Sequence, residues 1–128
     1  MPSQEAVLTR LSEVPLEREP FRILAEKAEA LREETNSILY GELIMSPTLS
    51  RDEVTCDFYI IANAGDYRYL LLDSTVHLNA DYPVRVYNSI AGVTTQIHNA
   101  ADYKRHINRI FNAPATIVFL RNLQRNPF

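Results

Sequence analysis

The sequence predicts an α+β domain: an antiparallel sheet of four or five strands, with N- and C-terminal helices packed on one face. Apolar residues recur at helical spacing near both ends of the chain and alternate with polar residues in between. The helices and strands also come in separate runs, which favours this class over an alternating βαβ order. The 128 residues fit one domain, with a helical N-terminal segment over 1–36, the sheet over 37–98 and C-terminal helices over 99–125.

Two helices are predicted before the sheet. Ser3 can cap a short helix over residues 3–14, which Pro15 ends. The second helix begins near Pro20, where a fixed φ suits the first turn, and it ends at Asn36. Its apolar stripe is narrow and rich in alanine, and it consists of Phe21, Leu24, Ala25, Ala28 and Leu31. Because no heptad repeat is sustained, we expect this stripe to pack flat on the sheet rather than in a coiled coil.

The middle of the chain contains the predicted strands. They span about residues 38–45, 53–62, 66–76, 83–88 and 93–97. The second strand alternates most cleanly, since its apolar side chains share one face: Val54, Cys56, Phe58, Ile60 and Ala62. In the first strand, the better core face consists of Leu39, Gly41, Leu43 and Met45. The pattern of the third strand leaves its inward face open, and Asp73–Thr75 is a candidate bulge or break.

Turn-forming residues separate these strands. Asn63–Asp66 predicts a tight hairpin turn, because Asn, Gly and Asp tolerate the positive φ that such turns need. A polar loop is predicted over 46–52, a turn over 79–81 and another over 89–92.

The end of the chain is predicted to be helical. Asn99 is a strong N-cap, and Asp102 follows in the first turn, where an acid is favourable. The apolar face of this helix consists of Tyr103, Ile107, Ile110 and Phe111. Pro114 can begin a last helix, but the β-branched run that starts at Thr116 leaves helix and strand both open for Thr116–Gln124.

Composition excludes several kinds of site. The three glycines lie too far apart for a phosphate-binding loop, and the one cysteine, Cys56, excludes an internal disulfide and fits a reducing compartment. Cys56 falls on the apolar face of its strand, so we expect a buried thiol. The N-terminus lacks the pattern of a signal peptide, and no apolar run reaches membrane-spanning length. We therefore expect a cytoplasmic protein that does not enter a membrane.

No catalytic or metal-binding pattern is found in the sequence. The histidines at 77, 98 and 106 lack the spacing of a helical zinc site. Ser74, His77 and Asp81 include the residue types of a triad, but they lack an elbow motif and are more simply polar strand-end residues. We predict no catalytic residues, no metal ligands and no cofactor.

Tyrosine and arginine are the residues that favour a binding role. Six of them in the sheet region are the predicted binding residues: Tyr59, Tyr67, Arg68, Tyr69, Arg85 and Tyr87. Tyrosine with arginine is typical of recognition surfaces, although tyrosines in sheets also bury their rings and keep the hydroxyl wet. Residues 37–99 carry three Arg and seven Asp or Glu, whereas residues 100–128 carry five Lys or Arg and one Asp. An acidic sheet disfavours binding to nucleic acid.

Three segments carry a resemblance to a known group of proteins. These are Asp57–Ala62, Tyr67–Leu71 and Tyr82–Asn88, followed by the capped helix from Asn99. Over about residues 40–125 the chain resembles a loose group of small bacterial proteins, some of which resemble toxin-immunity proteins. The resemblance implies a binding role and supplies no catalytic residues.

The sequence therefore predicts a non-enzymatic protein-interaction domain, as an inhibitor or immunity-type partner of another bacterial protein. The alternative is a small-ligand domain or enzyme with a pocket between sheet and helices that uses Asp57, Asp73, His77 or Arg85. A homodimer, paired through an edge strand or the N-terminal helices, is a third possibility. The strand order, the identity of the partner and the presence of a pocket stay open.

Overall fold

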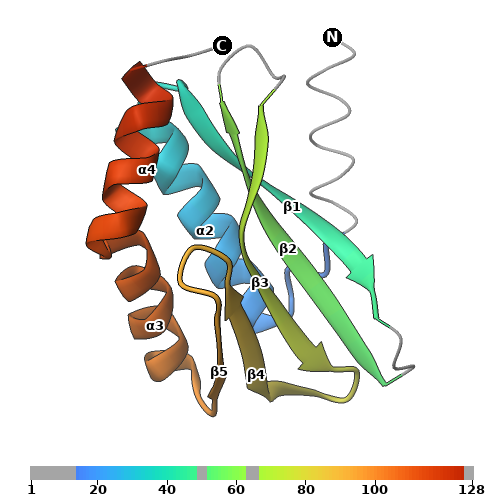
Figure 1. Cartoon of the computed structure of the whole chain (residues 1–128). Coiled ribbons are helices and arrows are strands. Elements are labelled where there is room, and N and C mark those ends of the chain that lie inside the picture. The colour runs from blue at the N-terminus through green and yellow to red at the C-terminus, as the bar shows by residue number, and fades with distance from the viewer. Residues whose placement is uncertain (1–13, 49–51, 63–66, 126–128) are drawn as a thin grey trace, which may run out of the picture.

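The computed structural model describes residues 14–48, 52–62 and 67–125 of the chain. A five-stranded antiparallel sheet in the order β1-β2-β3-β4-β5 forms one layer, and α2, α3 and α4 form a second layer on one face of it (Figure 1). The strands are β1 (Leu39–Pro47), β2 (Glu53–Ala62), β3 (Arg68–His77), β4 (Ala80–Asn88) and β5 (Val93–Ile97). The helices are α2 (Glu19–Glu34), α3 (Ala100–Asn112) and α4 (Pro114–Arg125). The predicted fold class is confirmed.

The start of α2 is fastened to the turn between β3 and β4. The Arg18 guanidinium pairs with the Asp81 carboxylate and donates to the backbone carbonyls of His77, at 2.7 Å, and Ala80, at 2.8 Å. Pro20 occupies the first turn of the helix, as its fixed φ predicts. These contacts set where α2 begins its passage over the sheet.

The passage of α2 over β1 is close because β1 carries a glycine there. A Cβ added at Gly41 would lie 2.6 Å from the Phe58 ring and 2.8 Å from the Cβ of Ala28. Contacts between side-chain carbons are not tolerated at such distances, so the helix reaches its observed position because residue 41 has no side chain. The small residues on the predicted stripe of α2 thus meet a small residue on the sheet.

The alternation predicted for β1 and β2 is confirmed. Leu43 lies directly opposite Phe58, and both side chains are buried on the helix-covered face. Cys56 lies on the same face, and burial raises the pKa of its thiol to about 12, so it stays protonated at neutral pH. The sheet contributes these buried residues to the core: Leu39, Leu43, Cys56, Phe58, Ile60, Ala62, Leu71, Leu72, Ser74, Val76, Val84, Val86 and Ile97.

Buried and outward-facing side chains do not alternate regularly along β3, because the register of its pairing with β2 changes part-way along the strand. Leu72 lies opposite Phe58, but the next pair is Leu70 with Tyr59, which leaves Leu71 as an extra residue. A bulge of this kind shifts the faces by one position. The irregularity therefore lies between Phe58 and Tyr59 and at the end of β3, and Asp73–Thr75, the predicted break, is regular strand.

The C-terminal helices pack on the same face as α2. The side-chain oxygen of Asn99 accepts a hydrogen bond of 2.9 Å from the backbone N–H of Asp102, which confirms the predicted cap. The Tyr103 hydroxyl lies 2.6 Å from the Ser74 hydroxyl of β3, and the Phe111 ring meets the Phe58 ring edge-on at 5.5 Å. Residues 114–125 form a helix, which settles the open choice between helix and strand.

Some predicted boundaries were wrong. β1 continues through Pro47, where a loop was expected, because its ladder with β2 extends to Val54. β4 begins at Ala80 instead of Pro83, because Ala80 pairs with His77 and the turn between them is shorter than predicted. The predicted helix over 3–14, apart from Val14, and the predicted turn over 63–66 lie outside the described residues.

Candidate interaction surface on the open face of the sheet

One face of the sheet is covered by none of the described helices (Figure 1). Side chains that alternate with the core residues form it, and we call it the open face. Its side chains, by register, are Tyr40, Glu42, Ile44, Ser46, Glu53, Thr55, Asp57, Tyr59, Ile61, Arg68, Leu70, Asp73, Thr75, Arg85, Tyr87, Thr94 and Gln96. Most of them are half-buried or exposed.

The open face brings together four of the six predicted binding residues. Tyr59, Arg68, Arg85 and Tyr87 lie on it. Tyr69 lies opposite Ile60 on the helix-covered face, where its ring is 4.5 Å from the Phe119 ring. Tyr67 precedes β3 and packs, half-buried, against the core. Successive side chains of a strand point to opposite faces of the sheet, which explains why Arg68 lies on the open face while the adjacent tyrosines, Tyr67 and Tyr69, do not.

At one end of the open face, a guanidinium covers a tyrosine ring. The central carbon of the Arg68 guanidinium lies 4.5 Å from the centre of the Tyr59 ring, and Arg68 also pairs with the Glu42 carboxylate. Glu42 lies directly opposite Tyr59 in the ladder between β1 and β2. A cation over a ring and an ion pair together restrict the rotamers of both side chains, so this part of the surface is held in shape before any partner arrives.

Two carboxylates face each other at the centre of the open face. Asp57 on β2 and Asp73 on β3 are direct cross-strand neighbours. Burial, followed by the nearby charge of Asp57, raises the pKa of Asp73 to about 6, although the Arg85 guanidinium acts to lower it. Burial also raises the pKa of Asp57. The pair therefore holds poorly neutralised negative charge beside the exposed ring of Tyr87, which lies opposite Asp73 on β4.

A hollow with a volume of about 320 Å³ lies where β3 and β4 separate. Their ladder passes directly from the Thr75–Arg85 pair to the His77–Ala80 pair, so the residues of β4 between Ala80 and Arg85 bulge away. The hollow is lined by Glu53, Thr75, His77, Ala80, Tyr82, Pro83, Arg85 and Gln96. The bulge gives an otherwise flat surface a depression beside Arg85.

Polar contacts fix the side chains around this hollow. The Arg85 guanidinium donates two hydrogen bonds to the Glu53 carboxylate, at 3.1 and 3.3 Å. The hydroxyls of Thr55 and Thr75 lie 2.7 Å apart and are buried. Sequence reasoning missed Glu53, Thr75 and Gln96 as site residues. The pattern of the third strand left the face of Thr75 open, and nothing in the sequence signalled the bulge that lies beside these three residues.

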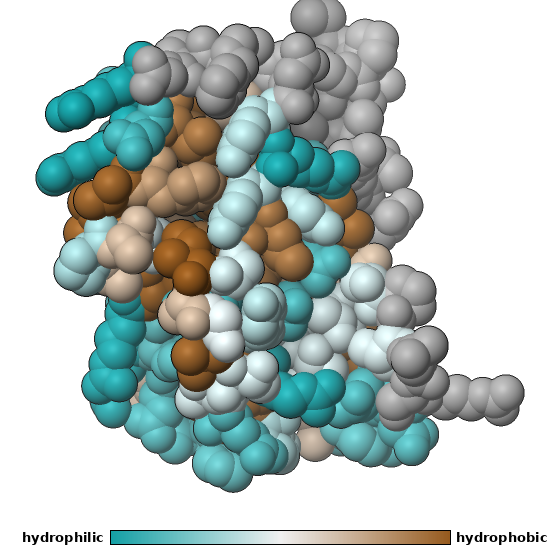
Figure 2. Space-filling model, in the orientation of Figure 1, coloured by the Kyte–Doolittle hydropathy of each residue, from teal (hydrophilic) through white to brown (hydrophobic). Residues whose placement is uncertain are grey.

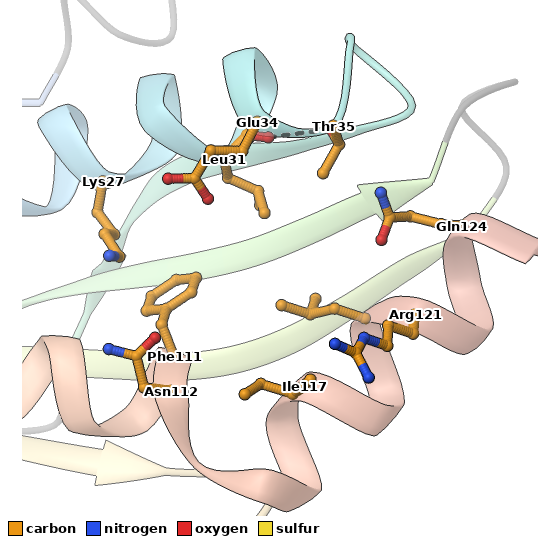
Figure 3. A pocket seen from close by; sticks show the side chains of 10 residues that line it. Lys27, Leu31, Glu34, Thr35, Phe111, Asn112, Ile117, Arg121 and Gln124 are labelled. Atoms are coloured by element: carbon orange, nitrogen blue, oxygen red, sulfur yellow. Dashed lines mark hydrogen bonds between the residues drawn. The ribbon is translucent and has the colours of Figure 1, made fainter.

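A second concavity lies on the opposite side, between α2 and α4. Its volume is about 280 Å³, and Figure 3 shows Leu31, Phe111 and Ile117 at its apolar part and Lys27, Arg121 and Gln124 around them. We call it the α2–α4 groove. Its remaining lining residues are Glu34, Thr35, Asn112 and Leu120. None of the four residues expected in a pocket between sheet and helices, Asp57, Asp73, His77 and Arg85, contributes to it.

Other candidate residues do not assemble into a reactive site. Ser74 is buried and bonded to Tyr103, His77 is exposed at the end of its strand, and Asp81 pairs with Arg18. Within the described residues, no group of three or more His, Cys, Asp or Glu is placed to hold a metal ion. No helix among them is both long enough and apolar enough to cross a membrane.

Comparison of the chain with models of protein families, with curated proteins and with solved structures found no match.

Proposed function

We propose that this chain is a non-enzymatic interaction domain that binds another protein through the open face. The observation that carries the proposal is the convergence of Tyr59, Arg68, Arg85 and Tyr87 on the one face that no described helix covers. Aromatic and arginine side chains are enriched where proteins bind one another. The open face is also partly rigid, because Arg68 and Arg85 are both held by carboxylates.

The charges of the open face favour a partner with lysine or arginine on its surface. Arg68 and Arg85 are already paired with Glu42 and Glu53. The negative charge of Asp57 and Asp73 is left in excess at the centre, next to Tyr87. A cationic side chain of the partner would relieve the repulsion between these two carboxylates. An inhibitor or immunity-type role suits such a domain, because it acts by covering a surface of its partner.

Alanine substitutions on the two faces test this proposal. Purified chain is measured for binding to the proteins encoded beside its own gene, and the dissociation constant is compared among variants. We expect Tyr87→Ala and Tyr59→Ala to weaken binding about tenfold or more, as truncations of aromatic side chains at the centre of an interface do. The matched controls, Lys104→Ala and Arg109→Ala, remove exposed side chains of α3 and are expected to change binding less than twofold.

Two outcomes would contradict the proposal. One is a partner whose affinity is unchanged by the open-face variants but falls in the α3 variants. The other is that none of the neighbouring gene products binds the unsubstituted chain.

A second candidate function is the binding of a small carboxylate with an apolar body in the α2–α4 groove. The groove combines the apolar side chains of Leu31 and Phe111 with two cations. The Lys27 ammonium lies 4.9 Å from the centre of the Phe111 ring, and Arg121 forms no ion pair with any described residue. Octanoate titrated into the chain and followed by NMR tests this candidate.

The expected result in that titration is saturable binding that Arg121→Ala weakens at least threefold. Arg125→Ala is the matched control, because Arg125 lies one turn further along α4 and does not line the groove. Equal octanoate binding by both variants, or no binding at millimolar concentration, would exclude the candidate.

A further inference from the structure

The two edge strands of the sheet differ in how well they are protected against pairing. β1 carries Glu42 and Pro47, and α2 packs along it. A charge and a proline are common devices against edge-to-edge association. β5 at the other edge has the sequence Val-Thr-Thr-Gln-Ile, with no charge and no proline. Its four β-branched residues have high strand propensity.

The outer side of β5 is accessible. Val93 is 52% exposed, and Thr94 and Gln96 are also exposed. In the described part of the chain, β4 is the strand that pairs with β5, and no other backbone hydrogen bond of residues 93–97 is found. In an antiparallel edge strand, alternate N–H and C=O groups point away from the sheet. Figure 2 shows apolar surface near the connection between β4 and β5, where exposed Val93 begins the strand.

We propose that β5 pairs with β5 of a second copy of the chain, antiparallel and across a two-fold axis at Thr95. The two five-stranded sheets would then form one continuous sheet of ten strands. A two-fold interface requires one surface to be complementary to itself. The sequence of β5 meets this requirement when it is read against itself in the opposite direction.

The side chains match on both faces of the proposed pair. On the helix-covered face, Val93 of one copy lies opposite the partner's Ile97, so apolar meets apolar. On the open face, Thr94 lies opposite the partner's Gln96, so polar meets polar. Just beyond the strand, His98 lies opposite the partner's Gly92, which has no side chain to obstruct it.

The same register avoids the usual penalties of self-pairing. β5 carries no charged side chain, so no like charges face each other across the axis within the ladder. The pairing also covers Val93, one of the large apolar residues that the single chain leaves exposed. Five paired residues on each side make a small interface, so we expect dimerisation to depend on concentration, with a dissociation constant on the order of micromolar.

Dimerisation would enlarge the open face without changing it. Thr94 lies next to Tyr87 in the ladder between β4 and β5. The open faces of the two copies would therefore meet along the axis and present two sets of Tyr87 and Arg85 to a partner. The pairing itself does not depend on the function proposed above, because it uses the strand edge and not the face.

Charge placed on Thr94 and Gln96 tests the register directly. In the proposed dimer, Thr94 of each copy lies opposite Gln96 of the other. Both side chains are exposed in the single chain, so substituting them leaves the core unchanged. The double variant Thr94→Lys/Gln96→Lys places lysine opposite lysine twice. The double variant Thr94→Lys/Gln96→Glu places lysine opposite glutamate twice. Sedimentation equilibrium from about 1 to 300 µM measures the dimer in each, and circular dichroism checks that both fold.

For the unsubstituted chain we expect a monomer–dimer equilibrium. The double-lysine variant should dimerise at least about tenfold more weakly, with partial recovery at high salt, and the lysine–glutamate variant should stay within about threefold of the original. Ala115→Lys/Asn122→Lys is the control, because it adds the same charge on exposed positions of α4. A chain that stays monomeric throughout, or a dimer that the double-lysine variant leaves intact, would overturn the proposal.

Discussion

At the scale of single residues, the Asp57–Asp73 pair places two carboxylates close together on the open face, and a cationic group of a partner would relieve their repulsion. The two carboxylates face each other across β2 and β3, and the pKa of Asp73 is raised to about 6 from the ordinary value of 3.8. A folded-state pKa above the unfolded value means that the folded chain binds the proton more tightly. The contribution of this proton to stability is fully present below about pH 3.8 and is lost as the pH rises through about 6.

A pH series checks this behaviour. We expect the free energy of unfolding, measured in urea, to decrease from pH 4 to 6 by more in the unsubstituted chain than in Asp73→Asn. At pH 7, Asp73→Asn should be the more stable of the two, because it removes the like charge beside Asp57. Glu29→Gln is a suitable control, since it removes an exposed carboxylate of α2 that lies away from the open face. Identical pH profiles for the chain and Asp73→Asn would mean that the pair does not repel as described.

At the scale of elements, the cap of α3 decides where the last strand gives way to helix. The Asn99 side chain accepts the backbone N–H of Asp102, and its amide also donates to the Asp102 carboxylate at 3.0 Å. Asn99→Ala should lower the free energy of unfolding by about 1 kcal/mol, and Asn99→Ser should lower it less, because serine also caps well and adds no charge beside the Asp102 carboxylate. Thermal unfolding measures both. Equal losses in the two variants would show that the cap is not the source of the effect.

Local patterns in the sequence predicted most elements because they are repeated within each element. The apolar alternation of β2, the proline at the start of α2 and the cap at Asn99 all depend on residues within a few positions of one another. The last helix had a weaker signal. Its β-branched run was compatible with a strand, whereas Thr116, Leu120 and Leu123 recur at helical spacing. In the structure this segment is a helix, in which Thr116 and Leu123 are buried and Leu120 is half-buried.

The candidate site was only partly predictable because it depends on pairing between strands. The inward face of β3 could not be read from the alternating tyrosines, since the register changes after Phe58. That change, together with the strand period, separates Tyr69 from Tyr59. The hollow beside Arg85 likewise arises from a bulge between two strands. Neither irregularity leaves a mark in a single segment of the sequence.

At the scale of the whole molecule, the two layers divide the chain into surfaces of different chemistry. The helix layer presents the basic residues of α3 and α4, including Lys104, Arg109 and Arg121. The open face presents tyrosines, paired arginines and an excess of carboxylates. A partner with a basic surface would therefore be attracted to the open face and repelled by the C-terminal helices, which orients the encounter before contact.

NMR mapping of the chain in complex with its partner tests the central claim most directly. We expect the chemical shifts that change on binding to belong to open-face residues, led by Tyr59, Asp73 and Tyr87, while residues of the α2–α4 groove keep their shifts. Changes confined to the groove, around Arg121 and Phe111, would contradict the assignment of the open face as the binding surface.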